Sequence, residues 1–215
     1  KVDYKISDGS EPGLKKINIS IEEKPTGEIT AGAGYGTEGG AFGFSIKENN
    51  YLGKGMKVSA NADITSQSVR GSLNIVNPNY NYSGNEVFGG FSSKKTDKAS
   101  SGYENTLVNF NIGTEFEQYR DVFFAPNLNF TIDDLSVDNT ASSNLKKQAG
   151  SFNDLTFGYV IKSDKRNRRF MPTDGHIVSF GQNLPVVADS KSIRNSFRYR
   201  PYHSFSDNLV GAFKV

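Results

Sequence analysis

The side chains that could perform chemistry are few, and none of them has the spacing of a common catalytic or metal-binding site. His176 and His203 are far apart, and the chain has no cysteine, so thiolate chemistry, disulfides and Cys/His zinc sites are excluded. The spacing of Asp133, Asp134 and Asp138 matches no EF-hand loop, which favours a solvated acidic loop over a calcium site. We therefore expect no enzyme activity, no cofactor and no metal.

A second candidate motif is formed by Gly34, Gly36 and Gly39, which match the GxGxxG pattern of dinucleotide-binding loops. Such a loop requires a following helix, whose N-terminus holds the pyrophosphate. Here the chain continues with apolar residues at every second position from Phe42 to Ile46. The glycines therefore belong to strands, and dinucleotide binding is rejected.

Alternation of apolar and polar residues is the strongest pattern in the sequence. From Met56 to Ile64, apolar residues at every second position are separated by Lys57, Ser59, Asn61 and Asp63. The same period of two returns in residues 69–75, 106–112, 128–132 and 155–161. Helical spacing is nowhere sustained, so we expect an all-β protein with about eleven strands after Gly27, separated by Gly, Asn, Asp and Pro turns.

Alternating strands occur in β-sandwiches, in lipocalin-like barrels and in membrane barrels, so the polar face must discriminate among them. That face is rich in Asn, Ser, Thr and Gly, and the strands approach the ~9–11 residues that cross a tilted bilayer. Tyrosines near strand ends suit the two membrane interfaces: Tyr35, Tyr51, Tyr80, Tyr82, Tyr103 and Tyr119. The sequence predicts an antiparallel transmembrane β-barrel, and a formal charge of +2 does not favour nucleic acid.

The connections alternate in length, as they do in outer-membrane barrels. If the first strand rises from the periplasm, every second connection lies outside the cell, and these are 37–40, 65–68, 93–102, 133–152 and 185–192. The connections on the periplasmic side are mostly short, and they include 50–55, 77–85, 115–121 and 204–207. The exception is 163–175, which carries Lys165, Arg166, Arg168 and Arg169. We interpret it as a solvated basic turn, with contact to phospholipid headgroups or a partner protein as the alternative.

The segment before Gly27 differs from the rest of the chain. Residues 2–6 and 17–21 alternate as two short strands joined by a Gly/Pro turn, and their Lys and Glu residues suit water. We expect residues 1–25 to be the closing hairpin of a small soluble domain and residues 26–215 to be the barrel portion. Because the chain begins at Lys1, we also expect it to be a piece of a longer precursor.

Four stretches carry a resemblance to a known family: "IEEKPTGEITAGAGYGTEGGAFGFSIKENNYLGKG" (21–55), "NPNY" (77–80), "FMPTDG" (170–175) and "YRPYHSFSDNLVGAFK" (199–214). Together they resemble the BamA family of outer-membrane protein assembly factors, in which a POTRA hairpin leads directly into the first barrel strand. The resemblance implies that the final strands and an inward-folded loop lie beyond Val215. The "SVRGS" at 68–72 is not taken as that loop's motif, because Ser72 replaces its Phe.

The resemblance also implies a location, a function and partners for this chain. It implies a bacterial outer-membrane protein, with its N-terminal hairpin in the periplasm, that folds and inserts other barrels. Its expected partners are unfolded outer-membrane clients, the lipid bilayer and, through the POTRA region, assembly-complex lipoproteins. The alternatives are a secretion pore of the two-partner type and a passive outer-membrane channel. The motif Pro172, Thr173, Asp174 and Gly175 is expected to form a tight turn.

The resemblance also implies that the first strand is a lateral gate at which client strands pair. The expected gate residues are Ile29, Thr30, Ala31, Gly32, Ala33, Gly34, Tyr35 and Gly36. Alternation would direct the odd-numbered residues to lipid and the even-numbered residues to the lumen. Each interior glycine costs roughly 0.5–1 kcal/mol relative to alanine, so such a strand is weakly held. The alternative is that the glycines make room for a bulky luminal neighbour.

Overall fold

The computed structural model describes residues 2–11, 13–36, 39–189 and 191–215, which form thirteen strands and two short helical segments. The strands are β1 (Val2–Asp8), β2 (Lys15–Ile21), β3 (Gly27–Gly36), β4 (Gly39–Tyr51), β5 (Met56–Thr65), β6 (Ser68–Tyr80), β7 (Asn85–Lys98), β8 (Tyr103–Tyr119), β9 (Val122–Val137), β10 (Gly150–Asp164), β11 (Gly175–Val187), β12 (Arg194–Ser206) and β13 (Leu209–Ala212). A 3₁₀ turn η1 (Ala99–Ser101) and a helix α1 (Ser143–Gln148) lie in two connections.

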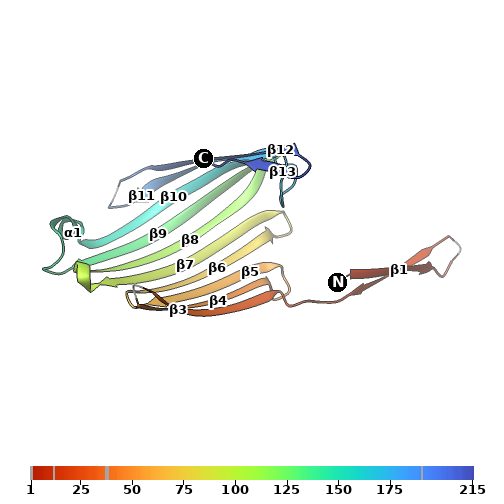
Figure 1. The fold of residues 1–215 in the computed structure, drawn as a ribbon. Coiled ribbons are helices and arrows are strands. Elements are labelled where there is room, and N and C mark those ends of the chain that lie inside the picture. Colours follow the sequence, from red (N-terminus) through yellow and green to blue (C-terminus); the bar gives the residue numbers. More distant parts are fainter. Residues whose placement is uncertain (1, 12, 37–38, 190) are drawn as a thin grey trace.

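The N-terminal hairpin is a two-stranded sheet of its own. β1 and β2 pair from Val2 with Ile21 to Asp8 with Lys15, and the side chains of Lys15 and Asp8 form an ion pair. Because the register is antiparallel without a shift, Val2, Tyr4 and Ile6 lie on the same face as Ile17, Ile19 and Ile21. Figure 1 shows the hairpin projecting away from the large sheet, to which residues 22–26 connect it.

The second sheet contains eleven antiparallel strands in the order β13-β12-β11-β10-β9-β8-β7-β6-β5-β4-β3. Every strand therefore pairs with its neighbours in the sequence, which is the simplest up-and-down topology. The eleven strands predicted from alternation are confirmed. The sheet is strongly curved, and β3 and β13 are its two terminal strands (Figure 1).

One face of this sheet is apolar across neighbouring strands. The register aligns one row of side chains from β4 to β10: Ile46, Ala60, Leu73, Phe91, Phe110, Phe130 and Leu155. The rings of Phe91 and Phe110 have centroids 4.9 Å apart. These residues lie side by side across the strands, no second layer of described residues covers them, and Phe110 stays 46% exposed. We refer to this surface as the apolar face.

The opposite face is polar, and its side chains bond one another across the strands. Ser45 Oγ donates to Asn61 Oδ1 at 2.8 Å, and Asn61 Nδ2 donates to Ser72 Oγ at 3.2 Å. Farther along the sheet, Asn109 Nδ2 donates to Thr131 Oγ1 at 3.0 Å. We refer to this surface as the polar face; its composition is the Asn, Ser and Thr pattern expected from the sequence.

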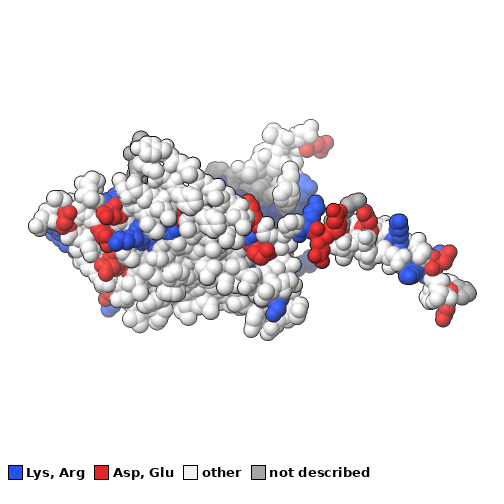
Figure 2. All heavy atoms as spheres, turned by 90° about the horizontal axis from the view of Figure 1, so that it is seen from below, with Lys and Arg blue, Asp and Glu red and all other residues white. Residues whose placement is uncertain are grey.

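The sheet has no dry core. Among the described residues, Ala141 is the only apolar side chain that is almost completely buried, with 6% of its surface exposed. Figure 2 shows one side of the molecule with a largely uncharged middle band and with Lys, Arg, Asp and Glu gathered toward the ends of the strands. An apolar surface of this extent is typical of a protein that binds another surface or lies in a membrane.

No described helix has the length and the apolar character needed to cross a membrane.

The strands are longer than alternation alone indicates, so the connections are shorter. β7 and β8 leave only residues 99–102 between them, where 93–102 was expected, and β8 and β9 leave only 120–121, where 115–121 was expected. The reason is that polar side chains at strand ends still pair across the ladder. Residues 37–38 of one expected connection, and residue 190 of another, lie outside the described residues.

The expected loop 133–152 contains a helix that the sequence reading did not anticipate. β9 continues to Val137, and α1 occupies Ser143–Gln148. Ser142 is its N-cap, and its hydroxyl oxygen accepts from the backbone N–H of Leu145 at 3.3 Å. A helix of fewer than two turns is too short to show a helical period, so the pattern of apolar residues does not predict it.

The connections define two ends of the sheet. The hairpin end is where the chain enters β3, and it carries the connections 52–55, 81–84, 120–121, 165–174 and 207–208. The α1 end carries η1, α1 and the remaining connections.

Candidate functional site

The first candidate site is the open edge of β3. β3 pairs with β4 along its whole length, from Gly27 with Glu48 to Gly36 with Gly39. On its other side no described strand is paired with it, and all ten of its residues are exposed. In an antiparallel ladder, alternate residues direct their N–H and C=O groups away from the paired neighbour. All eight residues predicted for the gate therefore lie on one continuous strand whose second edge has no described partner.

Three glycines of β3 differ from several glycines in the middle of the sheet. A Cβ added to Gly32, Gly34 or Gly36 would have no described atom within 4 Å. At Gly90 in β7, by contrast, an added Cβ would lie 2.3 Å from Oδ1 of Asn111. No described side chain requires Gly32, Gly34 or Gly36, so the bulky neighbour of the alternative interpretation is not found among the described residues.

The two faces of β3 continue the faces of the sheet. The register aligns Ile29, Ala31 and Ala33 with Ile46, Phe44 and Phe42 of β4, on the apolar face. Tyr35 ends this series and is 90% exposed. The polar side of the strand is formed mainly by glycine and is almost without side chains.

The second candidate site is the basic connection between β10 and β11, which contains the "PTDG" motif. The motif folds back on residues 165–167: Lys165 N–H donates to His176 O at 2.9 Å, and Asn167 N–H donates to Asp174 O at 3.1 Å. Gly175 has a φ of +92°, and a Cβ there would lie 2.1 Å from Lys165 O, so this position requires glycine.

The side chain that organises this connection is Asn167, which sequence reasoning missed. Its Oδ1 accepts from the backbone N–H groups of Thr173 and Asp174 at 3.1 and 3.3 Å, and its Nδ2 donates to Thr173 Oγ1 at 2.7 Å. No hydrogen bond of the Asp174 carboxylate is found among the described residues. The signal that could have identified Asn167 is the tendency of Asn to bond nearby backbone in loops.

The cations of this connection are not equivalent. Arg166 makes two bonds to Asp164, with Nε to Oδ1 at 2.9 Å and an Nη to Oδ2 at 2.7 Å, and donates to Arg169 O at 3.2 Å. The carboxylate of Asp164 raises the pKa of Arg166 above its ordinary value. Lys165, Arg168 and Arg169 are exposed. Arg166 is therefore a structural residue, whereas the other three cations project into the surroundings.

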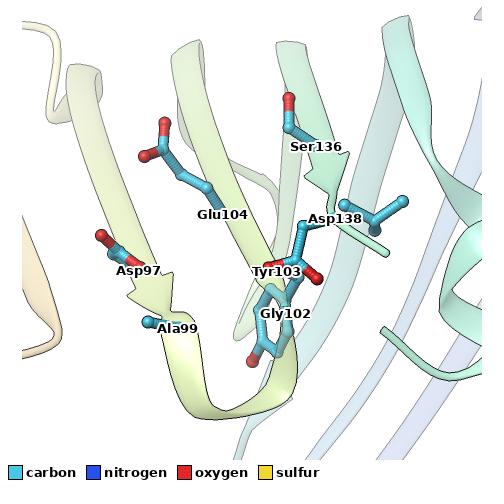
Figure 3. Close-up of a pocket in the computed structure, with 8 residues that line it drawn as sticks. Asp97, Ala99, Gly102, Tyr103, Glu104, Ser136 and Asp138 are labelled. Carbon is cyan, nitrogen blue, oxygen red and sulfur yellow. The ribbon is translucent and has the colours of Figure 1, made fainter. Parts of the chain in front are cut away.

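A third site to consider is a cleft at the α1 end, with a volume of about 290 Å³. Its carboxylates come from three segments, as Figure 3 shows: Asp97 from β7, Glu104 from β8, and Asp138 from the chain after β9. Glu104 is paired with Lys95 at 2.9 Å, and Asp138 accepts from Thr140. The described residues contain no group of three or more His, Cys, Asp or Glu that could hold a metal ion.

The two histidines and Asp133 lie in separate places. His176 packs near the ring of Tyr199, with centroids 6.0 Å apart, and His203 lies 5.1 Å from the ring of Phe205. The carboxylate of Asp133 accepts from Asn105 Nδ2 at 2.6 Å on the polar face. The structure brings none of these groups together into a site.

Comparison with known proteins identifies the fold. The chain is 23% identical over 198 residues to the outer membrane protein assembly factor BamA of Neorickettsia risticii (strain Illinois), covering 89% of this chain and 26% of that protein. The crystal structure of BamA from Haemophilus ducreyi lacking POTRA domains 1–3 superposes with a TM-score of 0.69 at 20% identity, covering all of this chain and 45% of that one. The chain thus spans about a quarter of the first relative and less than half of the second.

These findings confirm the antiparallel transmembrane β-barrel fold class and the resemblance stated from the sequence motifs. The Omp85 superfamily domain matches residues 50–215, which is most of the chain, and so the chain belongs to the Omp85 superfamily.

Proposed function

We propose that this chain is the client-receiving part of an outer-membrane protein assembly factor and that the free edge of β3 pairs with incoming client strands. The observation that carries the proposal is a ten-residue strand that is unpaired on one side among the described residues and has glycine at 32, 34 and 36 that no described neighbour requires. The matches to proteins named as assembly factors support it. The hairpin would lie on the periplasmic side, where the rest of the POTRA region meets assembly lipoproteins.

The physical basis is the cost of unpaired backbone in hydrocarbon. An unsatisfied N–H or C=O group costs roughly 2–7 kcal/mol away from water, so an open edge within a membrane pairs with whatever strand is offered. Edge pairing of this kind supplies affinity through the main chain and tolerates many sequences. Because glycine side chains add no packing to the seam, the partner of β3 can be exchanged at low cost.

The two faces of the sheet support a position in the bilayer. The apolar face, with Phe110 and Ile112 exposed, suits lipid, and the hydrogen-bonded polar face suits a water-filled lumen. A polar lumen is also the observation that favours the second candidate, a secretion pore of the two-partner type. A pore should conduct ions and pass one dedicated protein, whereas an assembly factor should speed the folding of several unrelated barrels.

A reversible crosslink tests the gate. The sequence has no cysteine, so Ala31→Cys or Ala33→Cys in the full-length protein can be paired with a cysteine on the strand that closes its barrel. We expect the oxidised protein to stop inserting clients into liposomes and the reduced protein to recover. The matched control is Ala60→Cys with Leu73→Cys, which joins two interior register partners and leaves the seam free.

Two results would count against the proposal. If the protein, shown to be crosslinked on a gel, inserts clients at the unlocked rate, the seam is not the gate. If the unlocked protein conducts ions but accelerates the folding of no client, the secretion pore is the better description.

A further inference from the structure

The connection between β10 and β11 exposes two large apolar side chains beside free cations. Phe170 is 81% exposed and Met171 is 69% exposed, so neither packs on the sheet. Arg168 and Arg169 precede them directly, and Lys165 is also exposed. An apolar pair that leaves the fold next to basic residues is unfavourable in water and suited to an interface between water and lipid.

The base of this connection holds the apolar and basic tip in place. The Asp164–Arg166 pair and the bond from Arg166 to Arg169 O fix one side, and the three bonds of Asn167 fix the other. Met171 has a φ of +47°, a backbone conformation that is unfavourable for a bulky side chain. The fold therefore keeps Phe170 and Met171 exposed, although the backbone conformation at Met171 is unfavourable.

Other turns at the hairpin end show the same feature. Leu52, in the turn between β4 and β5, has a φ of 55° and is 71% exposed. Tyr82, in the turn between β6 and β7, has a φ of 56° and is 95% exposed. Gly and Asn are the residues that such positions favour. Three bulky side chains held outward at one end of the sheet indicate that this end meets an apolar or interfacial medium.

Charge distinguishes the β10–β11 connection from these other turns. Residues 164–174 contain four cationic and two carboxylate side chains, which gives a net formal charge of +2. One carboxylate, Asp164, is already bound by Arg166. The free charge at the tip is therefore positive, and its complement is an anionic surface.

We propose that residues 165–171 anchor the hairpin end of the sheet to anionic phospholipid headgroups, with Arg168 and Arg169 bound to the phosphates and Phe170 and Met171 in the interfacial layer. The inference rests on the proposed membrane location but not on client assembly. It assigns a ligand class to the basic turn and gives the adjoining "PTDG" motif a positioning role.

The test places a reporter at the tip of the full-length protein. Phe170→Cys, in a protein without other cysteines, carries an environment-sensitive fluorophore, and the protein is reconstituted in phosphatidylcholine vesicles with or without phosphatidylglycerol. We expect blue-shifted emission and stronger quenching by brominated phosphatidylglycerol than by brominated phosphatidylcholine. Arg168→Gln and Arg169→Gln should each reduce this preference about fivefold.

Lys147→Gln is the matched control, because Lys147 is an exposed cation at the opposite end of the sheet and should leave the preference unchanged. Equal quenching by both lipids, or no effect of the arginine substitutions, overturns the anchor. Loss of the preference on adding inorganic phosphate would assign the site to free phosphate instead. A reporter that remains in water while the arginine substitutions abolish client insertion would assign it to a protein partner.

The two proposals can fail separately. Client insertion by the unsubstituted protein is measured in the same vesicles, so a retained lipid preference without insertion contradicts only the assembly function. Insertion without a lipid preference contradicts only the anchor.

Discussion

The side-chain amide of Asn183 in β11 occupies the space that a side chain on Gly158 in β10 would need. A Cβ added to Gly158 would lie 2.4 Å from Oδ1 of Asn183 and 2.6 Å from Oδ1 of Asn127 in β9. Glycine in the middle of the sheet thus lets two amides from the flanking strands meet on the polar face. Gly32, Gly34 and Gly36 of β3 have no such neighbours among the described residues, although the sequence shows them, like Gly158, simply as glycine within a strand.

This difference predicts opposite responses to alanine. Gly158→Ala should destabilise the full-length barrel by about 1 kcal/mol, because the two amides must rotate away. Gly34→Ala should be neutral or stabilising by up to ~1 kcal/mol, because it meets no atom and removes glycine's conformational freedom. Urea titration in lipid or detergent, followed by the gel mobility of folded and unfolded forms, measures both. Equal losses at the two positions would contradict this account of the glycines.

Alternation was sufficient to predict the eleven strands, their antiparallel order and the two faces of the sheet. The prediction succeeds because strands that follow one another in the sequence also pair in the sheet. The positions of the strands therefore determine their order, and the period of two within each strand determines its two faces. It could not predict the lengths of the strands, because the charged residues near the α1 end, where alternation is lost, still pair in the ladder, and Lys95 and Glu104 form a diagonal ion pair across β7 and β8.

The candidate sites were predicted less completely. The placement of residues 29–36 on one strand was predicted, whereas their role as a gate is implied by the family resemblance and stays a proposal. The role of Asn167 could not be predicted from the sequence, because its three hydrogen bonds reach residues six and seven positions away and depend on how the connection folds. The exposure of Phe170 and Met171 could not be inferred either, because an apolar pair in a sequence is expected to pack.

The Asn167 bonds give a second prediction. Asn167→Ala should loosen the connection between β10 and β11 and lower the stability of the barrel by about 1–2 kcal/mol, because it removes one donor and one shared acceptor. Asp174→Asn should have little effect on stability, since the Asp174 carboxylate makes no described hydrogen bond. Amide hydrogen exchange at Thr173 and Asp174 reports the change directly. If Asp174→Asn loosens these amides as much as Asn167→Ala does, the motif is organised by Asp174 instead.

The last prediction concerns acid and the connection that follows β9. Asp138 lies beyond the strand, and the hydrogen bonds from the Thr140 hydroxyl (2.6 Å) and the Thr140 N–H (2.7 Å) lower its pKa below the ordinary value of 3.8. The backbone N–H of Asp138 donates to Gly102 O at 2.9 Å and so ties this connection to the turn after η1.

A carboxylate whose pKa is lowered by folding stabilises the fold at every pH above its unfolded value, and the contribution is lost as the pH falls through the folded value. Exchange of the Asp138 amide should therefore be constant from neutral pH down to about 3.8 and should accelerate below it, after correction for intrinsic rates. Thr140→Val removes the hydroxyl donor, so the pKa of Asp138 should rise toward 3.8 and the pH-dependent loss of protection should become smaller. Thr140→Ser keeps the donor and should behave like the unsubstituted protein. An unchanged Asp138 titration in Thr140→Val, followed by carboxyl NMR in detergent micelles, would show that the hydroxyl does not hold this carboxylate.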